Sequence, residues 1–220
     1  MDNEYYSIAI DGPAGAGKST IAKKVAERLD IEYIDTGAMY RALTLKILKN
    51  HIDPLDKDNV IKVIKTTNID FNKNSICLDG VSVDKEIREN IISQNVSHIA
   101  KIEEVRNILV RLQQNMAKNK SVVMDGRDIG TVVLPNAKYK FFLTATVEER
   151  ATRRYKELIN KGVKDISLND IISDIIKRDN IDTNRDVGPL KQAKDACLLD
   201  TTDKTIQECV DFIVSIVLGG

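Results

Sequence analysis

The chain alternates between short apolar runs and longer stretches in which apolar residues recur at helical spacing. The first run, Tyr5 to Ile10, is rich in β-branched and aromatic residues and ends at Asp11-Gly12, which predicts a buried strand. Apolar residues at positions 21, 22, 25, 26 and 29 share one helical face and predict a helix over Lys18 to Leu29. The chain therefore begins as a strand, a glycine-rich loop and a helix.

The same alternation continues toward the C-terminal end. Four further strands are predicted at Ile31–Ile34, Val122–Met124, Lys140–Leu143 and Ala196–Leu199. Helices are predicted at Gly37–Leu48 (capped by Thr36), Ile99–Met116, Val147–Ile159, Leu168–Arg178 and Ile206–Val217, and Ile61–Ile64 is predicted to lie on a further short helix. This order favours an α/β fold with a parallel five-stranded sheet, helices on both faces and ligands at the carboxyl ends of the strands.

One segment departs from the alternation. Three short extended runs, Asn68–Phe71, Ile76–Asp79 and Val81–Val83, are separated by the turn residues Asn72-Lys73-Asn74 and Asp79-Gly80. Short strands joined by such turns predict a small antiparallel meander. We interpret residues 55–95 as an insert lobe within a single domain that spans residues 1–220.

The charge balance and the cysteine content limit which binding partners and which cellular compartment are expected. Lysine plus arginine (33) balances aspartate plus glutamate (33), which argues against bulk binding of nucleic acid or membrane. The apolar runs are too short to span a bilayer, and residues 1–4 lack the basic start of a signal peptide. The three cysteines are scattered, as in a reducing cytosol, and the two histidines offer no zinc site. We expect a cytoplasmic protein, with a monomer as the default.

The glycine-rich loop matches the phosphate-loop pattern G-x-x-x-x-G-K-[ST] without a mismatch. Its glycines let several backbone N–H groups face phosphate oxygens, and the following helix adds the positive end of its dipole. Lys18 is placed to reach the β- and γ-phosphates, and the Ser19 hydroxyl to bind Mg²⁺. The pattern predicts ATP as co-substrate, bound by Gly12, Pro13, Ala14, Gly15, Ala16, Gly17, Lys18, Ser19 and Thr20.

A phosphate loop by itself is compatible with motors, switches, transporters and kinases. Switch GTPases read guanine through an N/TKxD segment, and the nearest approach, residues 72–75, lacks the aspartate and lies in the wrong place. No glutamine or glutamate is placed to position an attacking water. A kinase must instead hold a second anionic substrate, which requires arginines. Arginines follow two predicted strands, at Arg41 and Arg127, and close a helix at Arg178 and Arg185, which favours a kinase.

Four motifs then occur in a characteristic order: Gly-Pro-Ala-Gly-Ala-Gly-Lys-Ser at 12–19, Asp-Thr-Gly-Ala-Met-Tyr-Arg at 35–41, Asp-Gly-Arg-Asp-Ile-Gly-Thr at 125–131 and Arg-Asp-x-x-Asp-x-x-Arg at 178–185. Together they resemble bacterial cytidylate kinases over nearly the whole chain, and the second and third are highly specific for that family. The meander resembles the insertion that separates this family from adenylate kinases and eukaryotic UMP/CMP kinases. The resemblance implies a three-layer P-loop kinase fold and ATP-dependent phosphorylation of CMP or dCMP in pyrimidine nucleotide metabolism.

The resemblance also implies roles at matching positions. Arg41, Arg127 and Arg185 would clamp the CMP phosphate and the transferring group, and Ser97, Arg106 and Asp128 would read the cytosine edge. Arg178 and Asp182 would contact the ribose, and Thr36 would touch the nucleotide near Arg41. Asp125 would lie between the two substrates, with Lys18, Arg127 and Arg185 as the other catalytic groups. Arg153, with Arg150 and Arg154, would face ATP beside a lid over residues 160–167.

Simpler structural roles compete with several of these assignments. Arg153 and Arg154 could pair with Glu149 or Glu157 on their own helix, and Arg106 with Glu103. Asp125 could cap a helix or hold Mg²⁺ as in other P-loop proteins. The acceptor could be another small molecule such as UMP, AMP or shikimate, and a nucleotide-dependent switch is the non-enzymatic alternative. The preference between CMP and dCMP stays open.

Overall fold

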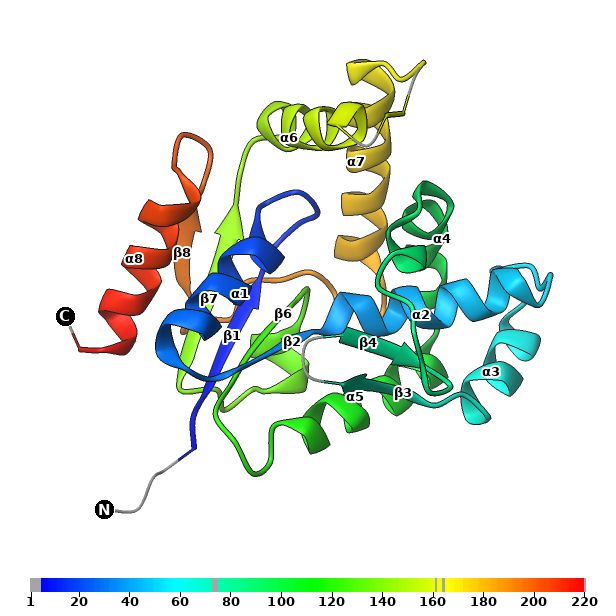
Figure 1. The fold of residues 1–220 in the computed structure, drawn as a ribbon, viewed down its shortest axis with the longest axis horizontal. Helices are drawn as coiled ribbons and strands as arrows, with labels where there is room; N and C mark the ends of the chain where they lie inside the picture. The colour runs from blue at the N-terminus through cyan, green and yellow to red at the C-terminus, as the bar shows by residue number, and fades with distance from the viewer. Residues whose placement is uncertain (1–4, 73–74, 161, 164, 220) are drawn as a thin grey trace.

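The computed structural model describes residues 5–72, 75–160, 162–163 and 165–219. A five-stranded parallel sheet in the order β2-β6-β1-β7-β8 forms its centre (Figure 1). The strands are β1 (Ser7–Asp11), β2 (Glu32–Asp35), β6 (Val122–Gly126), β7 (Tyr139–Thr144) and β8 (Cys197–Asp200). All four neighbouring pairs are parallel, which confirms the predicted α/β class and sheet.

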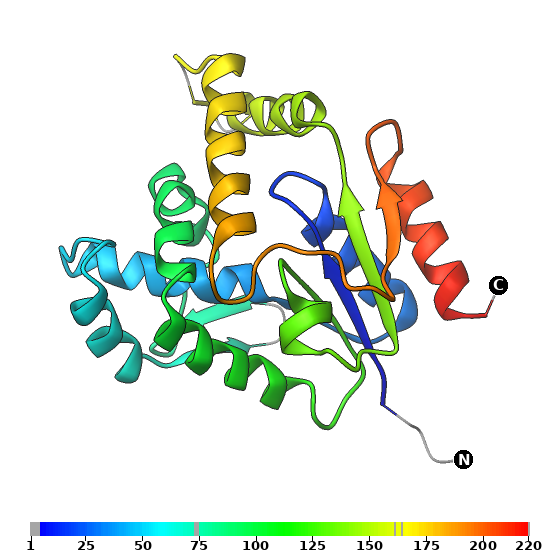
Figure 2. The ribbon, with the colours of Figure 1, turned by 180° about the vertical axis from the view of Figure 1, so that it is seen from behind.

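Helices cover both faces of this sheet because its strands carry apolar residues on both sides. On one face, Ile8 and Ile10 pack with apolar residues of α1 (Lys18–Leu29) and α8 (Ile206–Val217). On the other face, Ala9 packs with apolar residues of the short π-helical turn η2 (Ile129–Val133) and of α5 (Glu103–Met116). Figure 2 shows the ribbon of this face from behind. The sheet is therefore the middle layer of three.

The predicted meander is present as a second, antiparallel sheet in the order β3-β4-β5. Its strands are β3 (Ile69–Asn72), β4 (Ser75–Leu78) and β5 (Val81–Ser82), preceded by α3 (Lys57–Lys65) and followed by the 3-10 turn η1 (Glu86–Arg88). The predicted turn residues Lys73 and Asn74 lie outside the described part of the chain. The lobe shares one apolar core with α2 (Thr36–Lys49), α5 and α4 (Asn90–Ala100).

The predicted helix over Ile99–Met116 is wrong in its first part. The structure has two helices here, α4 and α5, separated at Lys101 and Ile102. Ile102 adopts extended backbone angles (φ −73°, ψ 117°), and its side chain is buried. The bend lets the apolar faces of both helices meet the same lobe core, which a straight helix could not do.

Two helix boundaries also differ from the predictions. Asp35, not Thr36, caps α2, because the Asp35 side chain accepts a hydrogen bond from the Ala38 N–H. The helix predicted over Leu168–Arg178 continues to Asn184 as α7 (Leu168–Asn184), so that motif residues 178–182 lie on the helix itself.

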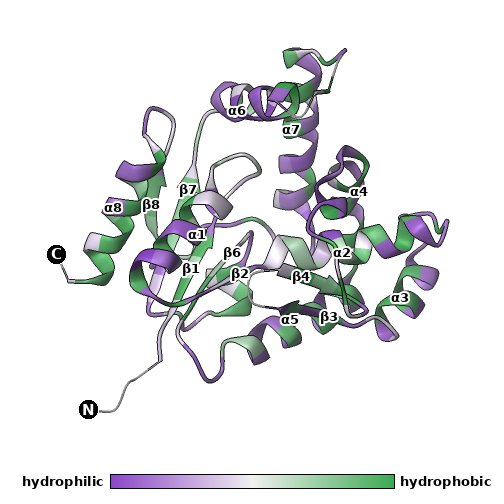
Figure 3. Cartoon of the chain, viewed as in Figure 1, coloured by the Kyte–Doolittle hydropathy of each residue, from purple (hydrophilic) through white to green (hydrophobic). Residues whose placement is uncertain are grey.

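Helices α6 (Val147–Asn160) and α7 lie beyond the carboxyl ends of the strands (Figure 1). They pack on each other through a small apolar cluster and are otherwise largely hydrophilic (Figure 3). Of the predicted lid at 160–167, Lys161 and Lys164 lie outside the described residues, while Ser167 caps α7. No helix in the described ranges has the length and apolar character needed to cross a bilayer.

Candidate functional site

A cavity of about 940 Å³ opens at the carboxyl ends of the strands, bounded by the sheet, α4, α6 and α7. Residues predicted to bind ATP and residues predicted to bind the phosphoryl acceptor both line this cavity. The lining includes Ala14, Gly15, Gly17, Lys18, Ser19, Thr20, Arg41, Ser97, Asp125, Arg127, Arg153 and Arg178. The remaining candidate residues, Gly12, Pro13, Ala16, Thr36, Arg106, Asp128, Asp182 and Arg185, do not line it.

The phosphate loop leaves β1 through a glycine that no other residue could replace. Gly12 has φ 146°, and a Cβ there would lie 2.0 Å from the Leu143 carbonyl oxygen. Beyond it, the buried Lys18 ammonium donates to the Pro13 carbonyl at 2.7 Å. Burial lowers the pKa of Lys18 well below its usual value, and Arg127 lowers it further. An anion bound at this loop would act in the opposite direction and raise the pKa of Lys18.

Asp125 lies at the end of β6, beside the loop. Its two carboxylate oxygens accept the Ser19 and Tyr33 hydroxyls, each at 2.8 Å, and its backbone oxygen accepts the Thr36 hydroxyl at 2.7 Å. Burial, with Asp35 as the next contribution, raises the pKa of Asp125 to about 6. Because its carboxylate oxygens accept side-chain hydroxyls and not the N–H groups of a helix end, the helix-capping alternative for Asp125 is wrong. A hydroxyl beside a carboxylate is a donor set that Mg²⁺ accepts, so these residues fit the predicted metal.

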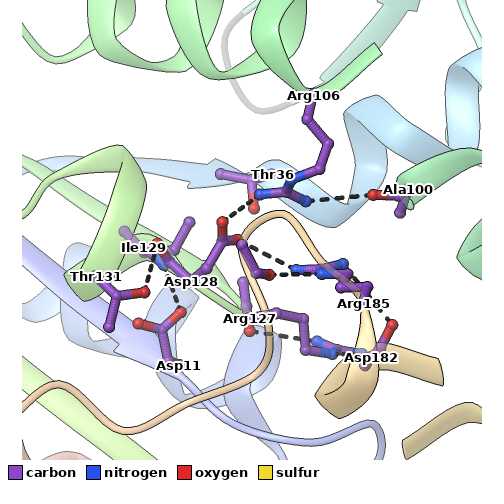
Figure 4. Close-up of polar contacts among 12 residues, drawn as sticks. Asp11, Thr36, Ala100, Arg106, Arg127, Asp128, Ile129, Thr131, Asp182 and Arg185 are labelled. Carbon is purple, nitrogen blue, oxygen red and sulfur yellow. Dashed lines mark hydrogen bonds and ion pairs between the residues drawn. The ribbon is translucent and has the colours of Figure 1, made fainter. Parts of the chain in front are cut away.

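A buried network of arginines and aspartates lies next to the cavity (Figure 4). Arg127 Nε donates to Asp182 Oδ2 at 2.9 Å, and Arg106 pairs with Asp128. Arg185 lies between the two carboxylates, 3.5 Å from Asp128 Oδ1 and 3.9 Å from Asp182 Oδ1. Since each guanidinium has a carboxylate partner, the charges are tolerated despite their burial.

Arg41, Arg127 and Arg178 are among the arginines that line the cavity. Arg41 is held by Asp35 at 2.8 Å. Burial, with Arg127 next, lowers the pKa of Arg178 to about 10, and its buried Nε has no hydrogen-bond partner among the described residues. A cavity wall with several guanidinium groups and one unpartnered donor is suited to a phosphate or another polar anion.

The predicted clamp is thus only partly assembled around the cavity. Arg41 and Arg127 line it together with the phosphate loop, whereas Arg185 lies behind the wall among Asp128 and Asp182. Placed there, Arg185 holds the two carboxylates that in turn hold Arg106 and Arg127.

The predicted base-reading residues come together in part. The Ser97 hydroxyl lines the cavity and lies 3.5 Å from Asp182 Oδ1. Arg106 is paired with Asp128 and not with Glu103, so the local helix-pair alternative is wrong. Arg106 and Asp128 lie behind the cavity wall, and their contact with a base stays a prediction. Thr36 likewise uses its hydroxyl on Asp125, and its contact with the nucleotide stays a prediction.

Arg153 and Arg154 of α6 form ion pairs with glutamates of the same helix, which was the structural alternative to an ATP contact. Arg153 pairs with Glu149 at 2.9 Å, and Arg154 with Glu157 at 2.8 Å. Arg153 also donates to the Thr201 carbonyl at 2.6 Å, which fixes α6 beside the end of β8, and both arginines still line the cavity. Arg150 reaches the phosphate loop at the Ala14 carbonyl (3.0 Å).

Several residues of the site were not predicted. Tyr33 and Asp35 position Asp125 and Arg41, and Asp179 accepts from Arg150 at 2.6 Å. Asp11 accepts two backbone N–H groups of η2. Asp11 and Asp35 each end a predicted strand, a position where polar residues collect around ligands in this architecture, and that signal could have marked them.

A sequence model described as cytidylate kinase matches residues 8–218. The chain belongs to the cytidylate kinase family. It is 56% identical over 211 residues to a cytidylate kinase of Clostridium botulinum strain Langeland, covering 96% of this chain and 97% of that one. A cytidylate kinase of Alkaliphilus oremlandii is 54% identical over 216 residues, covering 98% and 99% of the two chains.

Solved structures extend the likeness to the fold alone. A shikimate kinase from Bacteroides thetaiotaomicron superposes with a TM-score of 0.51 at 13% identity, covering 98% of this chain and 99% of that one. A gluconokinase from Sinorhizobium meliloti gives 0.51 at 12% identity, with coverage of 98% and 94%. The fold of this cytidylate kinase family member is therefore shared with small-molecule kinases of other specificity.

Proposed function

We propose that this protein transfers the γ-phosphoryl group of ATP to the 5′-phosphate of CMP or dCMP, giving CDP or dCDP. One observation carries the proposal: the phosphate loop and the guanidinium groups of Arg41, Arg127 and Arg178 line a single cavity. Two polyanions can meet end to end there, since cations surround the point where their phosphates would touch. Membership of the cytidylate kinase family supports this acceptor.

On the donor side, backbone N–H groups of the phosphate loop after Pro13 would cradle the ATP phosphates, and Lys18 would turn from the Pro13 carbonyl to the β- and γ-oxygens. Ser19 and Asp125 would hold Mg²⁺, directly or through water, and the ion would neutralise phosphate charge. Arg153, which already faces the cavity, would contact ATP from the α6 side.

On the acceptor side, Arg41 and Arg127 would hold the CMP phosphate, and Arg178 with Asp182 the ribose. No strong general base is required, because the attacking oxygen belongs to a phosphate that is largely deprotonated at neutral pH. Catalysis is then positioning together with stabilisation of charge by Lys18, Arg127 and, from behind the cavity wall, Arg185. Asp125 would order the Ser19 hydroxyl between the two substrates.

Selectivity for cytosine would come from Ser97, Arg106 and Asp128. A carboxylate can accept from the exocyclic amine of cytosine, whereas uracil presents a carbonyl at that position and would oppose one acceptor with another. Each buried polar group left without a partner costs about 1–3 kcal/mol. We therefore expect CMP and dCMP to be much better acceptors than UMP.

The test is a set of steady-state rates with CMP, dCMP, UMP and AMP against ATP, in an assay coupled to ADP formation. Comparable kcat/KM for UMP would remove the cytosine assignment. No transfer to any nucleoside monophosphate would remove the kinase assignment as well.

A lid around residues 160–167 should exclude water from the reaction. Hydrolysis of ATP without CMP should accordingly be far slower than transfer. The same coupled assay run without acceptor measures it, and a fast uncoupled ATPase would contradict the lid.

A further inference from the structure

Asp11 ends β1 and is followed directly by Gly12, the first residue of the phosphate loop. Its side chain contacts the η2 turn. One carboxylate oxygen accepts the Ile129 N–H at 2.7 Å, and the other accepts the Gly130 N–H at 2.8 Å (Figure 4). The same residue thus touches the turn that follows Arg127 and Asp128, which are central to the proposed acceptor site.

The chemistry of this contact requires a carboxylate. Two N–H groups converge on one side chain, so the side chain must present two acceptors, and an asparagine would bring one NH₂ group against an N–H. Asp11 is buried, with 3% of its surface exposed, and its hydrogen bonds come from backbone amides. Burial raises the pKa of Asp11 to about 6, while the two amide hydrogen bonds act in the opposite direction.

The frame around Asp11 leaves the carboxylate little freedom. Asp11 stands in register with Gly126 of β6 and with Phe142 of β7, so its backbone is held from both sides. A Cβ on Gly130 would lie 3.4 Å from Asp11 Oδ2 and 3.2 Å from Lys140 Cδ, so little space is left around the turn. The Asp11 carboxylate therefore links the end of β1, which leads into the phosphate loop, to the η2 turn.

We propose that Asp11 is a positioning residue that fixes the Arg127–Asp128 segment relative to the phosphate loop, and so sets acceptor binding and base discrimination. The inference rests on the proposed function. Asp11 reaches no substrate and acts through the backbone of residues 129–130. Those amides determine where Asp128 meets Arg106 and Arg185, and where Arg127 leaves β6 to meet Asp182.

The main test is the substitution Asp11→Asn, which keeps the size of the side chain and removes one acceptor. We expect the KM for CMP to rise roughly 10- to 100-fold, because small misplacements of binding groups have effects of that size. The ratio of kcat/KM for CMP to that for UMP should fall, while the affinity for a fluorescent ATP analogue should change little. A residue needed only for folding would lower the active fraction and leave both the KM and the ratio unchanged.

A second variant approaches the same contact from the other side. Gly130→Ala places a Cβ 3.4 Å from Asp11 Oδ2 and 3.2 Å from Lys140 Cδ, so the turn has to adjust by a few tenths of an ångström; the variant should shift KM and the ratio in the same direction by a smaller factor. Val210→Ala, in the buried face of α8, is the matched control. It should lower the melting temperature without changing the KM for CMP or the ratio.

Hydrogen exchange separates failure of this inference from failure of the proposed function. Amides in a peptide covering residues 126–134 should exchange faster in Asp11→Asn than in the wild type, whichever acceptor the enzyme uses. If the wild type does not phosphorylate CMP, the proposed function is wrong. The discrimination ratio is then measured as kcat/KM for the best acceptor over kcat/KM for the second-best acceptor. Unchanged exchange, or unchanged KM and ratio in the folded variants, would overturn the role of Asp11.

Discussion

The two halves of the cavity are built in opposite ways. The donor half is built mainly from one continuous stretch, residues 12–20, whose functional groups are backbone amides, one ammonium and hydroxyls, and Asp125 and Arg153 join it from elsewhere. The acceptor half takes its charged groups from β2, α2, α5, β6 and α7, which are separated by as many as 150 residues between Asp35 and Arg185.

This difference has a physical origin. Backbone amides carry no net charge, so the loop can be held by glycine geometry and by the strand and helix that flank it. Buried guanidinium groups need carboxylate partners, and those partners come from other elements. Arg127 needs Asp182, Arg106 needs Asp128, and Arg41 needs Asp35. The acceptor half therefore exists only when the whole domain is folded.

The largest effect is expected in the donor half. Lys18→Met should lower kcat by roughly 100-fold or more with every acceptor, because removing one preorganised charge at the transferring group costs that much. The coupled assay with CMP and UMP measures it. Lys24→Met, on the exposed side of the same helix, is the matched control and should keep full activity. A loss confined to CMP would contradict the division into halves.

The second effect belongs to the acceptor half. Arg127→Ala should lower kcat roughly 100-fold, because the transferring group loses a cation, while ATP affinity stays nearly intact. Titration with a fluorescent ATP analogue, alongside the kinetics, separates the two halves. Asp182 would lose its partner at 2.9 Å, so melting temperatures must be recorded together with the rates. Turnover that survives in the folded variant would show that the clamp is misassigned.

The smallest effect concerns stability at the boundary between the halves. The folded-state pKa of Asp125, about 6, lies above its unfolded value near 3.9, so the folded state binds the extra proton between these values. The charged carboxylate therefore lowers the free energy of unfolding above pH 6, and this cost disappears as pH falls toward 4. Asp125→Asn should raise that free energy by about 1–3 kcal/mol at pH 7.5, with the gain shrinking through pH 6.

Urea unfolding at pH 7.5, 6.0 and 4.5 measures this gain, and a gain independent of pH would contradict it. Asp79→Asn in the insert lobe is a control of opposite sign. Its pKa is lowered by the hydrogen bond from Lys46. Asp79 therefore stabilises the fold at neutral pH, and its variant should lose stability almost equally at all three pH values, because they all lie above the unfolded pKa near 3.9.

Local patterns were sufficient for much of the fold. The five strands, the meander and the closing helix, predicted and observed at Ile206–Val217, follow from apolar periodicity and turn residues. The break at Lys101 and Ile102 was not predicted, because both sides of it continue an apolar helical pattern. Only the lobe core, which both helices must contact, decides that the chain bends there.

The amino-acid sequence by itself determined the phosphate loop, the order of the strands along the chain and the motifs that carry the arginines, since each depends on neighbours within a few residues. The tertiary structure alone decided which carboxylate meets which arginine, and that Arg185 lies behind the cavity wall and not in it. It also decided that Asp11 contacts the turn at Ile129, which follows the neighbouring strand β6. Such contacts depend on the register and packing of distant segments, which a linear pattern does not contain.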